Sequence, residues 1–146
     1  MIEGETLRMF FQIGLAAALG LFVGLEREYK RKAAGMRTYA LVSLGAALFT
    51  ILSVEGFQQF GNGVQDPARV AAQVVVGIGF LGAGLIFIQQ GGVQGLTTAA
   101  GLWAIAAVGM AVGVQLYSLA IFTSVLILLI LWILKKFMRL YIQYKT

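Results

Sequence analysis

Apolar segments long enough to cross a lipid bilayer recur along the chain and constrain its fold more than any other feature. A helix needs about 17 to 25 mostly apolar residues to cross the hydrocarbon core. Five segments approach this length, at about 8–25, 38–54, 67–89, 96–113 and 117–134. Because unpaired backbone groups are costly in lipid, each segment should be helical. The sequence therefore predicts an all-α integral membrane protein with five transmembrane helices.

Composition agrees with a single membrane domain over residues 1–146, ending in a basic tail at 135–146. Of the residues, 60% are hydrophobic and 12% are charged, and the mean hydropathy is +0.88. This is too apolar for a soluble domain. The chain has no cysteine and no histidine, which excludes disulfides, thiolate chemistry and histidine metal ligands. No nucleophile motif stands out, so we do not expect an enzyme.

Basic residues gather at two places beside apolar segments. One cluster lies between Arg27 and Arg37, and the other between Lys135 and Lys145. The positive-inside rule places both clusters in the cytoplasm, which requires an even number of spans between them, and four fit. The N-terminus is then outside and the C-terminus cytoplasmic. Membrane orientation explains the net charge of +5 better than nucleic acid does, so no nucleic-acid partner is expected.

The segment from Asp66 to Ile88 is expected to be the centre of the fold. Asp66 followed by Pro67 is typical of a helix start, so the helix is predicted to begin at Asp66. On that helix Arg69 and Gln73 share a face with Asp66, and polar groups suit contact with protein or an aqueous crevice. Asp66 and Arg69 are spaced to form an ion pair. The equal alternative is a helix cap beside a snorkelling arginine.

Glycines recur in the apolar segments at spacings that suit close helix contact. Two GxxxG motifs occur, at Gly20–Gly24 and at Gly109–Gly113. Each motif suits a contact either within one protomer or at a dimer seam. The run GIGFLG at 77–82 matches a dinucleotide-binding fingerprint, but it lies mid-helix and no acidic residue follows it, so it is assigned to helix packing. The glycines expected to pack helices are Gly20, Gly24, Gly77, Gly79, Gly82, Gly84, Gly101, Gly109 and Gly113.

The fourth span carries a small, weakly polar face that includes Thr97, Gly101 and Ala104. Small residues let helix backbones approach closely. This face is therefore expected to meet the Arg69 and Gln73 face of the third span, in a packing role more than a ligand-binding one.

Charged residues near the ends of the spans are the candidates for ion chemistry. Glu26 ends the first span and Arg37 opens the second, so an ion pair between them is predicted to clamp this hairpin. Carboxylates are preferred Mg²⁺ ligands, which makes Asp66 and Glu26 the candidate metal ligands. The predicted topology puts those two at opposite membrane faces. No acid or base lies near mid-membrane, so the sequence offers no complete ion site within one protomer.

Three blocks of sequence together resemble a known family. They are GLEREYKRKAAGMRTYALVSLGAALF, DPARVAAQVVVGIGFLGAGLIF and GLTTAAGLWAIAAVGMAVG, in that order. The chain resembles the MgtC/SapB family membrane domain from the first span through the fourth, whereas the fifth matches only in hydrophobic character. The positions that match the family's polar signature are Glu26, Arg27, Gly35, Arg37, Thr38, Asp66, Arg69, Gln73, Thr97 and Thr98.

The resemblance implies a multi-pass protein of the bacterial inner membrane that is associated with growth under magnesium limitation. The favoured role in the family is regulation of other membrane proteins, although the family has also been labelled a Mg²⁺ transporter. Many members continue into a cytoplasmic regulatory domain after the fifth helix. The chain is expected to lack that domain, since only a basic tail follows the fifth span.

Two functions stay open at this point, beside a purely structural role. The first is a non-enzymatic regulator that docks another membrane protein through small-residue faces. The second is a homo-oligomeric cation (Mg²⁺) channel or transporter, in which symmetry, for instance that of a dimer, brings together copies of Asp66, Arg69 and Gln73. The expected partners are membrane lipids, a second copy and another membrane protein. No cofactor is expected, and Mg²⁺ enters as a ligand or as the transported ion.

Overall fold

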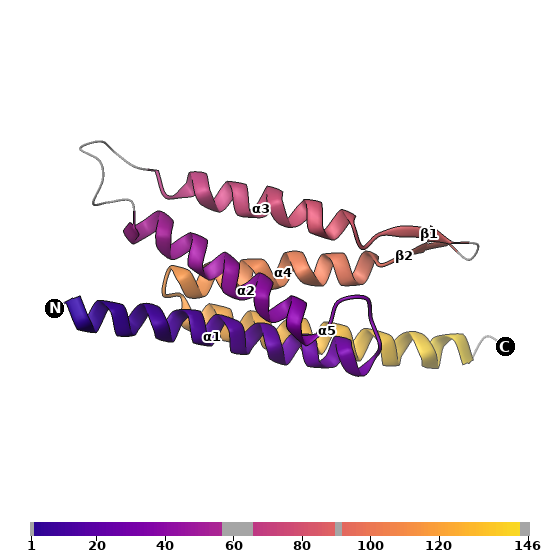
Figure 1. The fold of residues 1–146 in the computed structure, drawn as a ribbon. Helices are drawn as coiled ribbons and strands as arrows, with labels where there is room; N and C mark the ends of the chain where they lie inside the picture. The colour runs from indigo at the N-terminus through magenta and orange to yellow at the C-terminus, as the bar shows by residue number, and fades with distance from the viewer. Residues whose placement is uncertain (1, 57–65, 90–91, 144–146) are drawn as a thin grey trace.

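The computed structural model describes residues 2–56, 66–89 and 92–143, with side chains as far as Ile133. Within these ranges the chain forms five helices and one short hairpin, so the all-α expectation is confirmed apart from that hairpin (Figure 1). The helices are α1 (Ile2–Tyr29), α2 (Met36–Ile51), which continues as the π-helical turn η1 (Leu52–Gly56), α3 (Ala68–Ala83), α4 (Leu96–Gly113) and α5 (Tyr117–Gln143).

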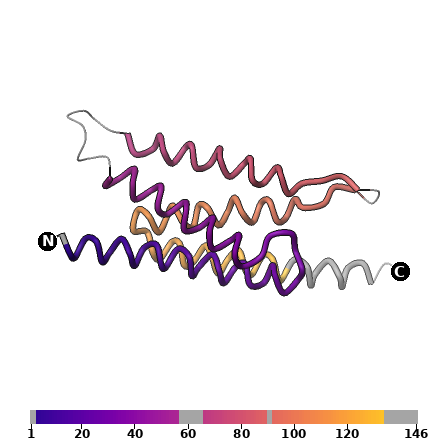
Figure 2. Tube along the Cα trace, viewed as in Figure 1, coloured from indigo at the N-terminus to yellow at the C-terminus, as the bar shows by residue number. Residues whose placement is uncertain are grey.

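Successive helices run back and forth along one axis, so that their connections alternate between two ends (Figure 2). We call the end that holds the α1–α2 connection and the start of α4 the basic end, and the opposite end the far end. Basic residues of the last turns of α1 and of the connection lie at the basic end: Arg27, Lys30, Arg31, Lys32 and Arg37. The C-terminal end of α5 also lies there (Figure 1).

Three stretches are long and apolar enough to cross a membrane, namely Glu3–Tyr29, Met36–Gly56 and Leu96–Gly113. The helix Ala68–Ala83 and the described part of α5, Tyr117–Ile133, are apolar but shorter. The chain therefore has the character of a membrane protein, while five crossings and an outside N-terminus stay predictions. The expected tail at 135–146 and most of the loop at 55–65 lie outside the residues whose side chains are described.

The central helix is α4, which contacts each of the four other helices. It carries no charged residue, and small and apolar residues form the faces that pack on its neighbours. One face, with Ala100, Trp103 and Ala107, stays exposed. The expectation that the Asp66–Ile88 segment forms the centre is wrong. The helix α3 lies at one edge of the bundle (Figure 1), and of its residues only Ile78 and Gly82 are buried.

The boundaries of α3 also differ from the prediction. The helix begins at Ala68 with Pro67 as its N-cap, and the carboxylate of Asp66 accepts a hydrogen bond from the Ala68 N–H at 2.9 Å. The capping role predicted for Asp66 is thus confirmed, although the helix starts two residues later. At the other end the helix stops at Ala83 instead of residue 89.

A two-stranded antiparallel hairpin follows α3 at the basic end. Strand β1 (Phe87–Gln89) pairs with β2 (Gly92–Gln94), with Phe87 opposite Gln94. The apolar run from Leu85 to Ile88 reads as a continuation of the helix, because a short apolar run has the same appearance in a helix and in a strand. This is why the third predicted span was too long.

Two helices end in the same hydrogen-bonded turn, closed by a residue other than glycine. After α1, the Lys32 N–H donates to the Arg27 carbonyl at 3.0 Å, and Arg31 takes a left-handed conformation with φ 50°. After α4, Gln115 has φ 64° and the same bond pattern recurs. Schellman turns usually have glycine at the left-handed position. The turn after α4 lies at the predicted boundary between the fourth and fifth helices.

Helix α2 is held between α1 and α4 by direct contact with glycine backbones. A Cβ added at Gly24 would lie 2.6 Å from the Met36 Cα, and one at Gly113 would lie 2.7 Å from the Thr50 Cβ. Gly20 and Gly109, the other members of the two GxxxG motifs, also face α2 backbone. Both motifs therefore form contacts within the protomer, which decides between the two alternatives left open by the sequence.

Candidate functional site

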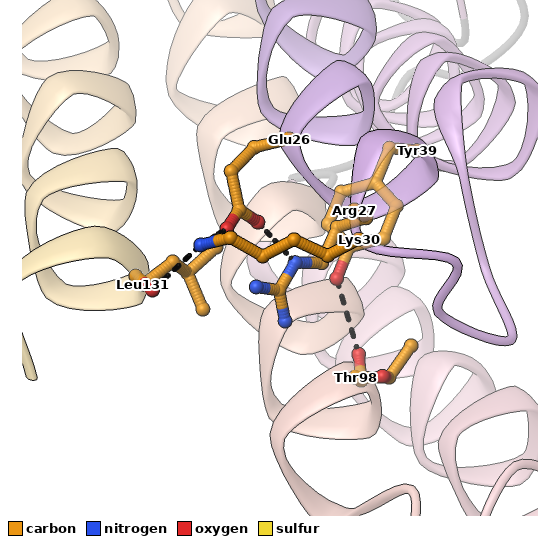
Figure 3. A network of polar contacts seen from close by, with 6 residues as sticks. All are labelled: Glu26, Arg27, Lys30, Tyr39, Thr98 and Leu131. Carbon is orange, nitrogen blue, oxygen red and sulfur yellow. Dashed lines mark hydrogen bonds and ion pairs between the residues drawn. The ribbon is translucent and has the colours of Figure 1, made fainter. Parts of the chain in front are cut away.

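A polar network at the basic end begins in the last turns of α1. The Arg27 Nε donates to Glu26 Oε2 at 2.5 Å, and Glu26 also forms an ion pair with Lys30 one turn further on (Figure 3). The Arg27 side chain is only 3% exposed. A buried guanidinium is costly without a paired acceptor, so Glu26 stabilises Arg27 inside the bundle.

The network extends from α1 towards the other helices. The Lys30 Nζ donates to the carbonyl of Leu131 in α5 at 3.5 Å, and the buried Tyr39 hydroxyl of α2 donates to the carbonyl of Thr98 in α4 at 3.3 Å (Figure 3). Thr98 is itself buried, whereas Thr97 beside it is exposed. These bonds join α1 to α5 and α2 to α4 at the basic end.

The predicted clamp between Glu26 and Arg37 is wrong. Arg37 and the adjacent Thr38 are exposed, and Glu26 is engaged by Arg27 and Lys30 instead. The hairpin is closed by Glu28, whose carboxylate accepts a hydrogen bond from the Met36 N–H at the start of α2 at 2.9 Å. The contact lies beside Gly35, the residue that precedes α2. Helix α2 has no carboxylate in its own first turn, so Glu28 supplies the acceptor and the negative charge that a helix start favours.

The polar residues of α3 lie on the outside of the described bundle. Asp66, Arg69 and Gln73 are all exposed, and within residues 66–89 no ion pair joins Asp66 to Arg69. Of the two alternatives for this pair, the helix cap is therefore the one observed. Gly77 and Gly79 have no described atom of another element within 4 Å of an added Cβ, and Gly84 faces only its own helix.

A groove of about 610 Å³ runs between α2 and α3. Its walls are mostly apolar side chains, such as Leu41 and Phe49 of α2 and Val74 of α3, and the two polar side chains that line it are Arg69 and Gln73. Gly77 lines the groove as well. The groove is present because α3 packs mainly on α4 and touches α2 much less.

The predicted contact between the polar face of α3 and the Thr97, Gly101 and Ala104 face of α4 is wrong. Gly101 faces the Tyr39 hydroxyl, which belongs to α2. Helix α3 meets α4 through Gly82, whose added Cβ would lie 3.5 Å from that of Ala99, and through an apolar cluster around Ile78. Small residues do mediate this packing, as expected, but on different faces of both helices.

The far end contains polar contacts that the sequence did not single out. The fully buried Gln12 of α1 donates from Nε2 to the carbonyls of Val112 and Gly113, each at 2.9 Å. These are carbonyls of the last turn of α4, which lack partners within their own helix. Arg8 and Glu55 form an ion pair at 2.7 Å that joins α1 to η1. A lone glutamine within an apolar span was the available signal for Gln12.

The two candidate metal ligands lie apart. Glu26 belongs to the end of α1 at the basic end, whereas Asp66 precedes α3 at the far end (Figure 1). Over the described residues no three His, Cys, Asp or Glu side chains come together as a possible metal site. Asp66 and Glu26 of one protomer therefore do not share a site.

The model of the MgtC family matches residues 13–140. The chain belongs to the MgtC family. Within this family it is 43% identical over 129 residues to the "Putative magnesium transporter YhiD" of Escherichia coli K12, a match that covers 86% of the chain and 60% of that protein.

Two further MgtC family relatives illustrate the range of the match. The chain is 47% identical over 113 residues to "Protein MgtC" of Brucella abortus, which covers 77% of the chain and 45% of that protein. It is 44% identical over 117 residues to the uncharacterized protein slr0014 of Synechocystis, a match that covers 80% of the chain and 48% of that protein. The chain thus spans about half the length of the curated relatives it matches. No solved structure matches the chain.

Proposed function

We propose that this chain is a non-enzymatic regulator of other membrane proteins, and that it acts in the bacterial inner membrane under magnesium limitation. The observation that carries the proposal is the groove between α2 and α3, which is lined by Arg69 and Gln73 among apolar residues. A transmembrane helix of a partner protein fits such a groove.

The polar side chains of the groove favour a partner over lipid. Polar and ionisable side chains of membrane helices usually face protein or a water-filled space and not lipid. Arg69 and Gln73 lie one turn apart on α3, with no side-chain partner among the described residues. A partner helix that carries a carboxylate near Arg69 and an amide or hydroxyl near Gln73 would satisfy both.

Gly77 of α3 supports the same face, because it lines the groove. An added Cβ at Gly77 meets no atom of another described element, so its backbone is free to receive a second helix closely. In contrast, Gly20 and Gly24 of α1 and the glycines of α4 already contact α2. Helix α3 therefore offers the surface with room for a regulated protein.

The orientation that we propose has the basic end in the cytoplasm and all five helices crossing the membrane. The gathering of Arg27, Lys30, Arg31, Lys32 and Arg37 at one end supports this arrangement through the positive-inside rule. The link to magnesium rests on the printed name of the relative YhiD and on the family.

The test of the regulator is growth at limiting Mg²⁺ of a strain that depends on this chain. Gly77→Leu, which fills the groove, should abolish growth at unchanged protein level, because the partner helix is excluded. Gly14→Leu is the matched control, since an added Cβ at Gly14 on α1 also meets nothing within 4 Å, and it should support growth. Equal growth of both variants would contradict docking in the groove.

The second candidate is a homo-oligomeric Mg²⁺ channel or transporter. It is favoured by the exposure of Asp66, Arg69 and Gln73 on one helix, which leaves all three available to a second copy around a symmetry axis. Mg²⁺ flux into proteoliposomes separates the candidates. Saturable flux that is lost in Asp66→Ala and Arg69→Ala would establish the transporter, whereas the regulator predicts no flux from correctly inserted protein.

A further inference from the structure

A second cavity, separate from the α2–α3 groove, lies at the basic end between α1, the β1–β2 hairpin, α4 and α5. Its volume is about 800 Å³. Apolar side chains of the hairpin and of α5, such as Phe87 and Ile130, form one part of its wall. The polar side chains of its wall are three cations, two hydroxyls and one amide: Arg27, Arg31, Lys32, Thr97, Thr98 and Gln94.

The buried Arg27 presents unused hydrogen-bond donors to this cavity. A guanidinium has five N–H donors, and the partner given to Arg27 among the described residues is Glu26, which binds its Nε. The two terminal nitrogens point away from Glu26, towards the first turn of α4 where Thr98 lies (Figure 3). The side chain is 97% removed from solvent, since 3% is exposed. Glu26 balances the charge of Arg27, but the terminal N–H donors of the guanidinium have no acceptor among the described residues and are available to a ligand in the cavity.

The start of α4 adds backbone donors to the same cavity. Its N-cap is Gly95, which has no side chain to accept a hydrogen bond, and no acidic residue occupies the first turn. The N–H groups of Leu96, Thr97 and Thr98 lack partners within the helix by their position. Together with the helix dipole, such a turn attracts anions.

The charges around the cavity all favour an anion. No carboxylate occurs among the described residues that line it. The nearest acids on α1 are engaged elsewhere, Glu26 with Arg27 and Lys30, and Glu28 with the backbone N–H of Met36. The left-handed conformation of Arg31 turns the chain so that Arg31 and Lys32 join Arg27 at the cavity.

We propose that this cavity is a phosphate-binding site. Arg27 and the first turn of α4 hold the phosphate oxygens, and Arg31 and Lys32 neutralise the remaining charge. The phosphate belongs either to an anionic phospholipid headgroup, with its acyl chains along the apolar wall, or to a soluble phosphate compound. Basic pockets between membrane helices bind lipid phosphates elsewhere by the same chemistry. The inference does not depend on the regulator or the transporter hypothesis.

The experiment uses the full chain in a neutral detergent and counts bound phosphatidylglycerol by native mass spectrometry. The double variant Arg31→Gly with Lys32→Gln should bind at least about 10-fold more weakly than the wild type, because two phosphate contacts are lost and glycine keeps the left-handed turn. Arg37→Gln is the matched control, since Arg37 is exposed in the same region but does not line the cavity. It should bind within about 2-fold of the wild type.

Two further arms identify the source of the phosphate. Phosphatidylcholine, which has a phosphate but no net charge, and inorganic phosphate are titrated in place of phosphatidylglycerol. Binding of phosphatidylglycerol that inorganic phosphate does not compete away supports the lipid headgroup, and effective competition supports a soluble phosphate. The proposal is overturned if no phosphate probe binds, or if Arg37→Gln weakens binding as much as the double variant does.

Discussion

Two regions of the bundle use the same residue type in opposite ways. Where α1 and α4 pack on α2, glycines such as Gly24 and Gly109 lie directly against α2, and additional atoms have no space there. On α3, Gly77 and Gly79 face open space. The comparison teaches that glycine spacing indicates where a second helix is able to approach closely. Whether that second helix belongs to the same chain or to another molecule depends on how the neighbouring elements pack.

Polar side chains show the same division between the two regions. Gln12 lies fully buried in the group of α1, α2 and α4 and donates two hydrogen bonds to α4, whereas Gln73 of α3 is exposed in a groove. Gln12 donates to carbonyls at the C-terminal end of α4. Gln73 is available to a partner. Paired substitutions in the two regions therefore test the comparison directly.

The largest effect is expected from Gly109→Ala. The added methyl group would collide with the Ser43 carbonyl of α2, and overpacking against backbone costs about 1 to 3 kcal/mol or more. The free energy of unfolding in mixed micelles, followed by tryptophan fluorescence, should fall accordingly. Gly14→Ala is the control, because its Cβ meets nothing within 4 Å. An equal response of the two variants would contradict the close α2–α4 contact.

The next largest effect is expected from Gln12→Leu. This change removes the side-chain donor from the Val112 and Gly113 carbonyls. Val112 keeps the hydrogen bond from the Gln115 N–H, but the carbonyl of Gly113 loses its donor, which costs about 1 to 3 kcal/mol. The same unfolding measurement should show Gln73→Leu to be close to neutral, since Gln73 is exposed. If Gln73→Leu destabilised the isolated protein as strongly as Gln12→Leu, the assignment of the two side chains to structure and to partner binding would be wrong.

Much of the fold could be predicted from the sequence because hydrophobic length and helix-end signals are local. The boundaries of α4 at Leu96–Gly113 and the start of α5 at Tyr117 match the predicted spans. The capping role of Asp66 followed from its own chemistry and that of Pro67. The family, now shown by the match over residues 13–140, followed from the order of three sequence blocks.

The central helix and the pairing of charges could not be predicted in the same way. A polar and small face on α3 suggested a buried helix, but α4 is central because small and apolar residues on several of its faces pack against all four other helices. Several cations lie near Glu26 in the sequence. The sequence alone does not determine whether Glu26 pairs with Arg37 or with its neighbours Arg27 and Lys30, which are the partners observed. The partner of each charged side chain depends on how each helix is rotated about its axis. That rotation is set by contacts with helices that are distant in the sequence.

A moderate effect is expected from Tyr39→Phe at the basic end. The change removes the hydrogen bond to the Thr98 carbonyl while keeping the ring, and a single hydrogen bond of this kind contributes about 0.5 to 1.5 kcal/mol. Tyr29→Phe serves as the control because Tyr29 is 88% exposed. Thermal unfolding should distinguish them, with only Tyr39→Phe lowering the midpoint. Identical midpoints for both variants would show that the hydroxyl contributes nothing to the α2–α4 contact.

The smallest effect on stability is expected from Gly77→Ala on α3, which also separates stability from function. Space is open at this position, and alanine favours a helix over glycine by about 0.5 to 1 kcal/mol, so the isolated protein should be unchanged or slightly more stable. Gly77 lines the groove, and the added methyl group increases the distance at which a partner helix packs there. Growth at limiting Mg²⁺ should therefore weaken although unfolding shows no loss of stability. Normal growth of this variant would show that close backbone contact at Gly77 is not needed for docking.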